Sequence, residues 1–98
     1  MALHLVEIHL DMSSKERAER AMTAANNVAS GHMPPGFSLV AGPWMSNEEA
    51  KLVVVVDFDD HNATLDFFWP AVARGTVLRR RFTPLVELAD LEAVIAKL

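Results

Sequence analysis

The segment Ala50–Asp57, Ala-Lys-Leu-Val-Val-Val-Val-Asp, decides the fold of this 98-residue chain. β-Branched residues favour strands, and a run of four valines indicates a strand that is buried on both faces. Such a strand needs two separate covering surfaces. We therefore expect it to lie inside a sheet, with helices of the chain on one side and another apolar surface on the other.

Three further segments have the character of strands. Ala2–Asp11 alternates between two faces, while Phe37–Trp44 and Thr76–Thr83 are predicted as the second and fourth strands. The turn residues Ser46–Glu49 join the second strand to the valine-rich third strand. In the first strand, the residues expected to share one face are His4, Val6, Ile8 and Leu10.

A first helix is predicted between the first two strands. Ser13, Ser14, Lys15 and Glu16 have the pattern of a capping box, with Ser13 as the N-cap and Glu16 reaching back to it. Gly31 ends this helix. Its apolar stripe has helical spacing and consists of Ala18, Ala21, Met22, Ala25, Val28 and Ala29.

A second helix follows the valine-rich strand. Asp59 or Asp60 is expected to cap it, and Pro70 is expected to kink it because proline removes one backbone hydrogen bond. Its predicted apolar face is Leu65, Phe68, Trp69 and Val72. A short C-terminal helix is marked by Leu88, Leu91, Val94, Ile95 and Leu98.

The resulting order, β-α-β-β-α-β-α, is the split βαβ plan. We predict an α+β, ferredoxin-like fold over residues 1–98 as a single domain, with a four-stranded antiparallel sheet, both long helices on one face and a bare opposite face. We expect the helices to cover Val6, Ile8, Val54, Val56, Leu78 and Phe82. The bare face then carries Leu3, Leu5, Val53, Val55 and Val77 at one end, and Glu7, His9, Asp57, Arg79 and Arg81 at the other.

The apolar part of the bare face predicts a homodimer. Exposed apolar surface costs roughly 25 cal/mol per Å², and docking two such sheets face to face removes that cost. The high hydrophobic content, 51%, agrees with a partner-covered surface.

Composition restricts the remaining classes. The net charge of −4 disfavours nucleic-acid or anionic-membrane partners. The absence of cysteine excludes disulfides, thiolate nucleophiles and cysteine-ligated metals. No apolar run is long enough to span a bilayer, and Glu7, His9 and Asp11 interrupt any signal-peptide pattern. We therefore expect a cytoplasmic protein.

Several short motifs resemble the dimeric α/β-barrel superfamily and, within it, a family of short bacterial proteins of unknown function. They are Pro34-Pro35-Gly36 before the second strand, Gly42-Pro43-Trp44 at its end, the valine-rich third strand, and Phe82-Thr83-Pro84 after the fourth. The superfamily includes cofactor-free monooxygenases, haem-degrading and haem-binding enzymes, lactone isomerases, polyketide cyclases and non-catalytic ligand-sensing domains. The resemblance implies a ligand cavity between sheet and helices, or between two sheets.

The candidate site is the polar end of the bare face. A carboxylate such as Glu7 can orient His9 as a general base, and Arg79 can hold a substrate enolate or carboxylate. Asp57 and Arg81 are expected to bind ligand beside them. The alternative is that these residues are cross-strand ion pairs on a half-solvated sheet. Arg80 is expected to face the helices and pair with a carboxylate there.

Aromatic residues extend the candidate site. Phe67 and Trp69 can form a pocket wall for a flat ligand, or they can pack as part of the second helix. Trp44 can line the mouth of a cavity or pack under the hairpin. His4 is expected in the core, and His32 and His61 in loops or at a helix start. Their spacing predicts no metal site, and we expect no cofactor.

Three functions remain open. The first is small-molecule binding or cofactor-free catalysis of the monooxygenase, isomerase or cyclase type on an apolar, oxygenated ligand, with His9 as base. The second is a non-catalytic dimerisation or ligand-sensing module. The third is haem binding, although the first strand lacks the asparagine used by some haem-degrading members, and His61 lies at the very start of its helix.

Overall fold

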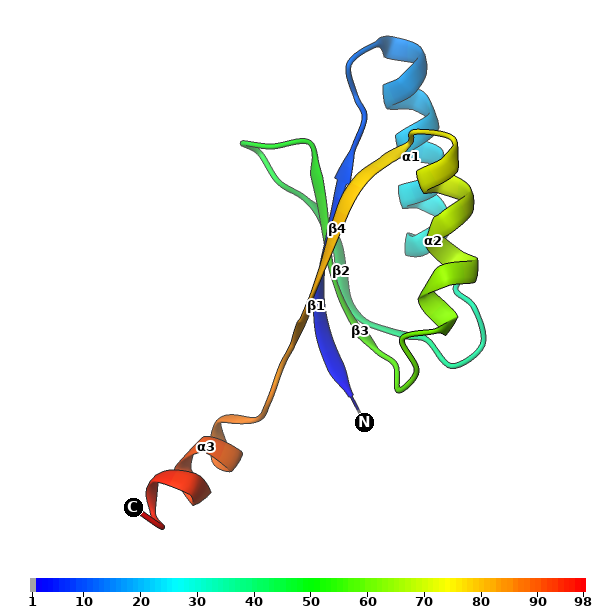
Figure 1. The fold of residues 1–98 in the computed structure, drawn as a ribbon. Helices are drawn as coiled ribbons and strands as arrows, with labels where there is room; N and C mark the ends of the chain where they lie inside the picture. Colours follow the sequence, from blue (N-terminus) through cyan, green and yellow to red (C-terminus); the bar gives the residue numbers. More distant parts are fainter. Residues whose placement is uncertain (1) are drawn as a thin grey trace.

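The computed structural model describes residues 2–98 as an open four-stranded antiparallel sheet with two helices packed on one face (Figure 1). The strand order is β2-β3-β1-β4. This confirms the predicted ferredoxin-like α+β fold, with the first strand between the third and fourth. The elements are β1 (Leu3–Leu10), α1 (Lys15–Ala29), β2 (Ser38–Met45), β3 (Lys51–Asp57), α2 (Ala63–Ala73), β4 (Val77–Pro84) and α3 (Leu88–Ile95).

The core lies between the sheet and the helices α1 and α2. Alternation along β1 and β3 is complete, so every second residue is buried against the helices. Phe58, which directly follows β3, is only 1% exposed and stacks on His4 at a ring-centroid distance of 4.1 Å. The buried strand residues of the core are Val6, Ile8, Leu10, Leu52, Val54, Val56 and Val77.

Within residues 2–98, no helix or strand covers the opposite face of β3. Val53 and Val55 are partly exposed there, whereas Val54 and Val56 are buried under the helices. The valine run therefore supplies a core on one side and an uncovered apolar strip on the other. This arrangement confirms that the helices cover one face and leave the other bare.

A bulge in β4 changes one part of the predicted face assignment. His9 pairs with Arg79, but Leu10 pairs with Val77, so Leu78 is an extra residue opposite β1. Val77 is consequently 5% exposed on the helix side, and Leu78 is 64% exposed. The prediction that Leu78 is covered and Val77 lies on the bare face was wrong.

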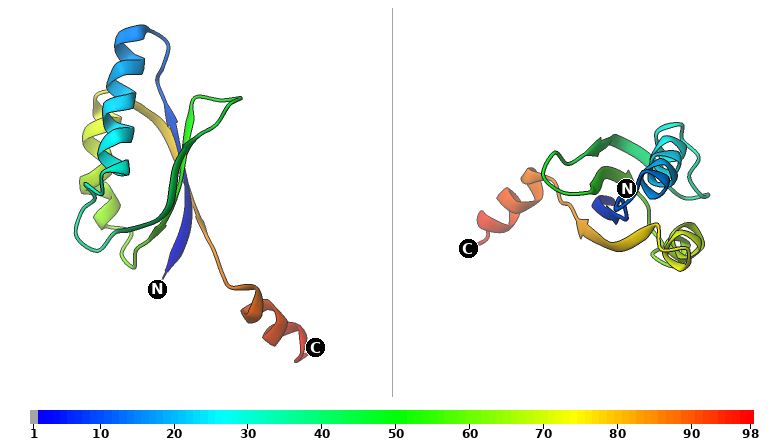
Figure 2. Two further views of the ribbon diagram at one scale, coloured as in Figure 1. Left: turned by 180° about the vertical axis from the view of Figure 1, so that it is seen from behind. Right: turned by 90° about the horizontal axis from the view of Figure 1, so that it is seen from above.

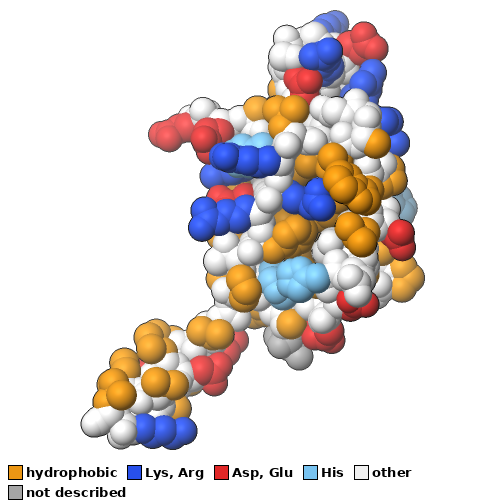
Figure 3. All heavy atoms as spheres, viewed as in Figure 1, with side chains coloured by type: hydrophobic (Ala, Val, Ile, Leu, Met, Phe, Trp, Pro, Cys, Tyr) orange, Lys and Arg blue, Asp and Glu red, His pale blue; other side chains and the backbone are white. Residues whose placement is uncertain are grey.

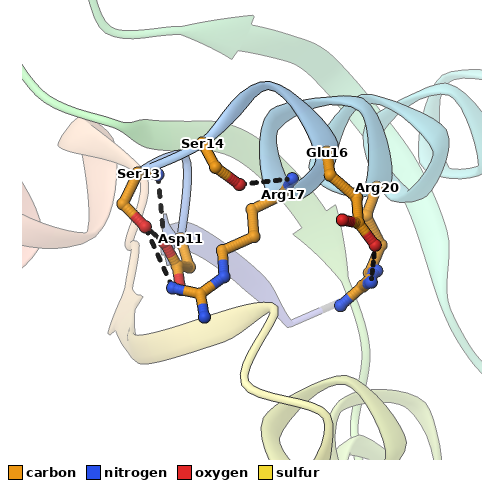
Figure 4. Close-up of polar contacts among 6 residues, drawn as sticks. All are labelled: Asp11, Ser13, Ser14, Glu16, Arg17 and Arg20. Carbon is orange, nitrogen blue, oxygen red and sulfur yellow. Dashed lines mark hydrogen bonds and ion pairs between the residues drawn. The ribbon is translucent and has the colours of Figure 1, made fainter.

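The start of α1 is capped one residue later than predicted (Figure 4). The Ser14 hydroxyl accepts a hydrogen bond from the Arg17 backbone N–H at 3.1 Å, which makes Ser14 the N-cap. Ser13 instead donates its hydroxyl to Asp11 at 2.6 Å, and Glu16 pairs with Arg20. These two contacts replace the reciprocal bonds expected of a capping box.

The start of α2 also differs from the prediction, because neither Asp59 nor Asp60 caps it. Asn62 occupies the N-cap position without a side-chain hydrogen bond, while Asp60 accepts from the Asn62 N–H. Within α2, Phe68 is buried and Trp69 is 53% exposed.

The C-terminal segment Leu85–Leu98, here named the arm, extends away from the sheet. Both views in Figure 2 show it on the side of the sheet opposite α1 and α2. Every residue of the arm is exposed. The longest dimension of the molecule is 54 Å, against 30 and 21 Å along the other two axes.

Candidate functional site

The polar end of the bare face is built by three neighbouring strands. In the backbone register, His9 on β1 lies between Lys51 on β3 and Arg79 on β4. In the next row, Glu7 lies between Val53 and Arg81. Residues two apart on a strand share a face, so the two rows lie on the same bare face. Every side chain of these rows except that of Val53 is polar.

An open hollow of about 380 Å³ lies over these two rows. It is lined by Glu7, His9, Glu49, Lys51, Arg79, Arg80 and Arg81. Four of the residues predicted for the site, Glu7, His9, Arg79 and Arg81, therefore meet around one hollow.

Lys51 organises the acidic groups of the hollow. Its Nζ lies 3.1 Å from Glu7 Oε1 and 3.3 Å from Glu49 Oε2. The hydrogen bond from Lys51 holds the pKa of Glu7 below its ordinary value. In turn, the hydrogen bond to Glu7 and, less strongly, the one to Glu49 raise the pKa of Lys51. Glu7 thus has Lys51 as its hydrogen-bond partner. Within residues 2–98, Glu7 forms no hydrogen bond with His9, so the predicted orientation of the His9 ring by Glu7 is not seen.

The arginines of the hollow are differently placed. Within residues 2–98, Arg79 and Arg81 form no ion pair. The Arg79 guanidinium is 3.4 Å from His9 Nε2, a long and weak contact. Because a guanidinium can only donate, His9 Nε2 is the acceptor here and the ring proton is assigned to Nδ1.

Arg80 points to the other side of the sheet. Its guanidinium carbon lies 5.3 Å from the centre of the Phe68 ring and 5.5 Å from that of Trp69. These are cation–π distances. The predicted pairing with a helix carboxylate is therefore replaced by contacts with two aromatic rings.

Asp57 does not join the polar end. It pairs with Leu3 at the far end of β1, and its Oδ1 accepts a hydrogen bond from the Ala2 N–H at 2.9 Å. The expectation that Asp57 shares one end of the sheet with Glu7 and His9 was wrong. β3 runs antiparallel to β1, so it is the beginning of β3, at Lys51, that lies beside His9.

The three aromatic candidates divide between the two faces. Trp44 pairs with Val53 and is 57% exposed beside the bare face. Trp69 and Phe67 belong to α2, on the helix-covered side. Phe67 lines a second hollow of about 220 Å³ between α1 and α2, whose other walls include Ile8, Leu10, Ala25, Val28, Phe68 and Arg74.

Sequence reasoning did not single out Lys51 or Glu49 for the site. The signal for Lys51 was present, because it is two residues before Val53 and so shares its face. Glu49 lies outside the strand, and no periodicity identifies it.

The remaining histidines lie away from the hollow. His4 is buried, its Nδ1 3.0 Å from the Ala2 carbonyl oxygen, and the His61 ring meets the His4 ring edge-on. His32 is exposed. In the described part of the chain, no three His, Asp or Glu side chains form a group that could hold a metal ion.

No protein-family model matches the chain, and no curated protein matches it. Among residues 2–98, none of the helices combines the length and the apolar character needed to cross a membrane.

Proposed function

We propose that this chain binds a small, apolar, oxygenated molecule over the bare sheet face and that His9 transfers a proton to and from it. The observation that carries the proposal is the division of charge in the hollow. Lys51 pairs with both Glu7 and Glu49, so Arg79 and Arg81 keep their positive charge available to a ligand. Guanidinium groups form strong charge-assisted hydrogen bonds with anionic oxygens such as those of a carboxylate, and an enolate oxygen carries the same kind of charge.

The rows below the hollow favour an apolar body on that ligand. Beyond the Glu7 row, Val55 lies beside Leu5 and Ala41 on the bare face. A ligand with its oxygen at the arginines can lay its carbon skeleton over this strip and over Trp44. Apolar contact then supplies affinity, and the arginines supply orientation.

His9 is the group placed for proton transfer. In the proposed step, a C–H bond next to a ligand carbonyl breaks, and the proton goes to His9 Nε2. The electron pair moves to the carbonyl oxygen, giving an enolate held by Arg79 or Arg81. Return of the proton to a different carbon completes an isomerisation. Since Nε2 contacts Arg79 in the free chain, the carbonyl oxygen of the bound ligand would draw Arg79 away and free the base before the C–H bond breaks.

The resemblance to the dimeric α/β-barrel superfamily supports the same reaction class. Its isomerases, cyclases and cofactor-free monooxygenases all act on oxygenated organic molecules. The proposal is limited to the proton transfer, which needs no metal, oxidant or cofactor.

Binding can be tested by nuclear magnetic resonance titration of the isotope-labelled protein with benzoate and with octanoate. We expect the largest amide shifts along β1, β3 and β4 near His9, and we expect the Arg79→Ala/Arg81→Ala variant to lose them. Lys15→Ala is the matched control, because the Lys15 side chain is 92% exposed on α1. Absence of shifts in the wild type, or equal shifts in the double variant, would overturn the anion site.

Catalysis can be tested with cyclohex-3-enone, whose isomerisation to the conjugated enone is followed by ultraviolet absorbance. We expect the wild type and His32→Ala to accelerate it and His9→Ala to be inactive while folded. Acceleration that persists in His9→Ala would remove His9 from the reaction. If the wild type does not accelerate the reaction, the proposed catalysis is overturned and only the proposed ligand binding stands.

We also propose that the bare face pairs with a second copy of the chain. The partly exposed Leu5, Val53 and Val55 support this, because an uncovered apolar strip of a sheet favours association. A non-catalytic dimerisation module is therefore the second candidate function. Sedimentation of the purified protein tests the dimer, and a monomer at all concentrations would exclude it.

A further inference from the structure

The arm is the least covered apolar segment of the molecule. Figure 3 shows hydrophobic side chains along it, well apart from the body of the protein. None of the residues of α3 is buried. The large apolar side chains of the arm, all 39–96% exposed, are Leu85, Val86, Leu88, Leu91, Val94, Ile95 and Leu98.

A helix of this kind needs a partner to be stable. α3 has eight residues, and isolated helices shorter than about 12 residues are marginal in water. In most proteins such helices are stabilised by packing an apolar face. The physical expectation is therefore that another surface covers α3.

The pattern of α3 describes that surface. Leu88, Leu91 and Ile95 fall at i, i+3 and i+7, which places them on one stripe. When the residues are placed at 100° intervals, Glu92 flanks this stripe on one side, whereas Asp90 lies toward the opposite face of the helix. The complementary surface is apolar in the middle and basic at its border.

The bare sheet face has this character. Its middle rows contain Leu5, Val53 and Val55, and its polar end contains Lys51, Arg79 and Arg81. Both surfaces belong to the same chain and both are uncovered. Figure 1 shows that the arm leaves on the bare-face side of the sheet but is directed away from its own face.

We propose that the arm of one copy packs its apolar stripe on the bare face of a second copy, and that the second copy's arm does the same in return. This exchange is isologous and closes as a two-fold dimer. A stable interface buries roughly 800 Å² of surface on each partner. The eight residues of α3 alone cannot supply this area. In the exchanged dimer each copy buries both its arm and its bare face, so there are two arm–face contacts. The inference goes beyond the proposed homodimer by assigning the arm as its main contact.

The exchange also bears on the hollow. With Glu92 drawn toward the basic border, the second copy's arm lies beside the open hollow and narrows the access of solvent to it. The arm and the carbon skeleton of the ligand proposed above both use the strip at Leu5 and Val55, so in the dimer the arm takes that strip and the ligand keeps the hollow and Trp44. The contact between copies does not require the ligand, so either proposal can fail alone.

The first experiment is analytical ultracentrifugation of full-length Leu91→Glu/Ile95→Glu. Because α3 packs on no other element within residues 2–98, the variant should keep the sheet, α1 and α2, and its circular dichroism spectrum should lose at most the helicity of the eight residues of α3. We expect a dimer for the wild type at about 10 µM and a loss of dimer affinity of roughly 100-fold or more for the variant, since each change occurs twice. Leu65→Glu on α2 is the matched control, because Leu65 is 44% exposed and Leu91 is 50% exposed.

The second experiment mixes this arm variant with Val55→Glu, a face variant that keeps an intact arm. Each is expected to be monomeric alone, and their mixture should form a heterodimer held by one intact arm–face contact, detected by native mass spectrometry. Thr83→Glu, on the same row, replaces Val55→Glu if the latter misfolds.

The outcomes separate the alternatives. A heterodimer in the mixture supports exchange. If the arm variant remains a dimer, the arm inference is overturned while the homodimer stands. If the wild type is a monomer, both are overturned, and the arm folds back on its own face or binds another molecule. Monomers in the mixture contradict docking of the arm on the face, whereas a Val55→Glu variant that forms a dimer by itself indicates arm-to-arm pairing.

Discussion

Lys51 and Glu7 are joined diagonally across two strands. The backbone register places Lys51 opposite His9, yet its ammonium reaches Glu7 at 3.1 Å, one row away. This diagonal contact keeps the carboxylate of Glu7 paired with Lys51, and among residues 2–98 it is Arg79 whose side chain contacts His9 Nε2. The chemistry open to the hollow follows from this one pair.

The pair predicts an acid-dependent loss of stability. The pKa of Glu7 is lowered in the folded protein, mainly by the hydrogen bond from Lys51, so the unfolded chain binds more protons below about pH 4.5. The stabilisation is present above that pH and is lost as the pH falls through the lowered pKa. We expect Glu7→Gln to flatten this dependence, and Lys51→Met to flatten it less because Arg81 and His9 still lower the pKa of Glu7, in chemical unfolding at one protein concentration. An unchanged slope in both variants would show that the pair does not form in solution.

Phe58 is predicted to be the most costly aromatic residue to truncate. It is 1% exposed and its ring contacts His4, Phe37, His61 and Phe82. We expect Phe58→Ala to lower the free energy of unfolding by about 3–5 kcal/mol. Trp69→Ala, at a residue that is 53% exposed, should cost less than about 1.5 kcal/mol. Similar losses for the two variants would contradict the core described here.

A side chain at Gly42 is predicted to cost more stability than one at Gly75. Its φ is +88°, and a Cβ there would lie 2.9 Å from the Val53 carbonyl oxygen. Gly75 has φ +79° but open space around it. Gly75→Ala should therefore cost about 1–2 kcal/mol from backbone strain alone, and Gly42→Ala at least about 1 kcal/mol more. Thermal unfolding of both variants measures the difference, and equal costs would rule out the close approach.

The two serines before α1 give a test of helix capping. Ser14→Ala should lower the free energy of unfolding by about 1 kcal/mol, because the Arg17 N–H loses its acceptor. Ser13→Ala removes an exposed side-chain contact with Asp11 and should cost less. The reverse order of the two costs would identify Ser13 as the cap after all.

Much of the architecture could be predicted because it depends on periodicity. The alternation in β1 and the valine run of β3 assigned residues to the correct faces, since a strand has a period of two wherever it is regular. The assignment failed at Val77 and Leu78, where two adjacent apolar residues fit either face. Only the pairing with β1 shows which of them is the extra residue in the bulge.

The site was only partly predictable for a different reason. The face on which a residue lies follows from alternation within its own strand. The end of the sheet at which it lies also depends on whether the neighbouring strand runs parallel or antiparallel. Asp57 was placed beside His9 without taking into account that β3 runs antiparallel to β1, and Lys51 was overlooked for the same reason. Phe67 and Trp69 were joined to the site although their helix packs on the other side of the sheet.

The irregular pairing of β2 has a consequence for self-assembly. β2 is an edge strand, and its register with β3 shifts twice, between Leu39 and Ala41 and between Ala41 and Trp44. Pro43, which has no backbone N–H, lies within the second shift. A strand of another molecule therefore finds no continuous ladder of donors and acceptors on which to add. The segment Leu39 to Trp44, whose shifts place Trp44 opposite Val53, therefore disfavours growth of fibrils from this edge.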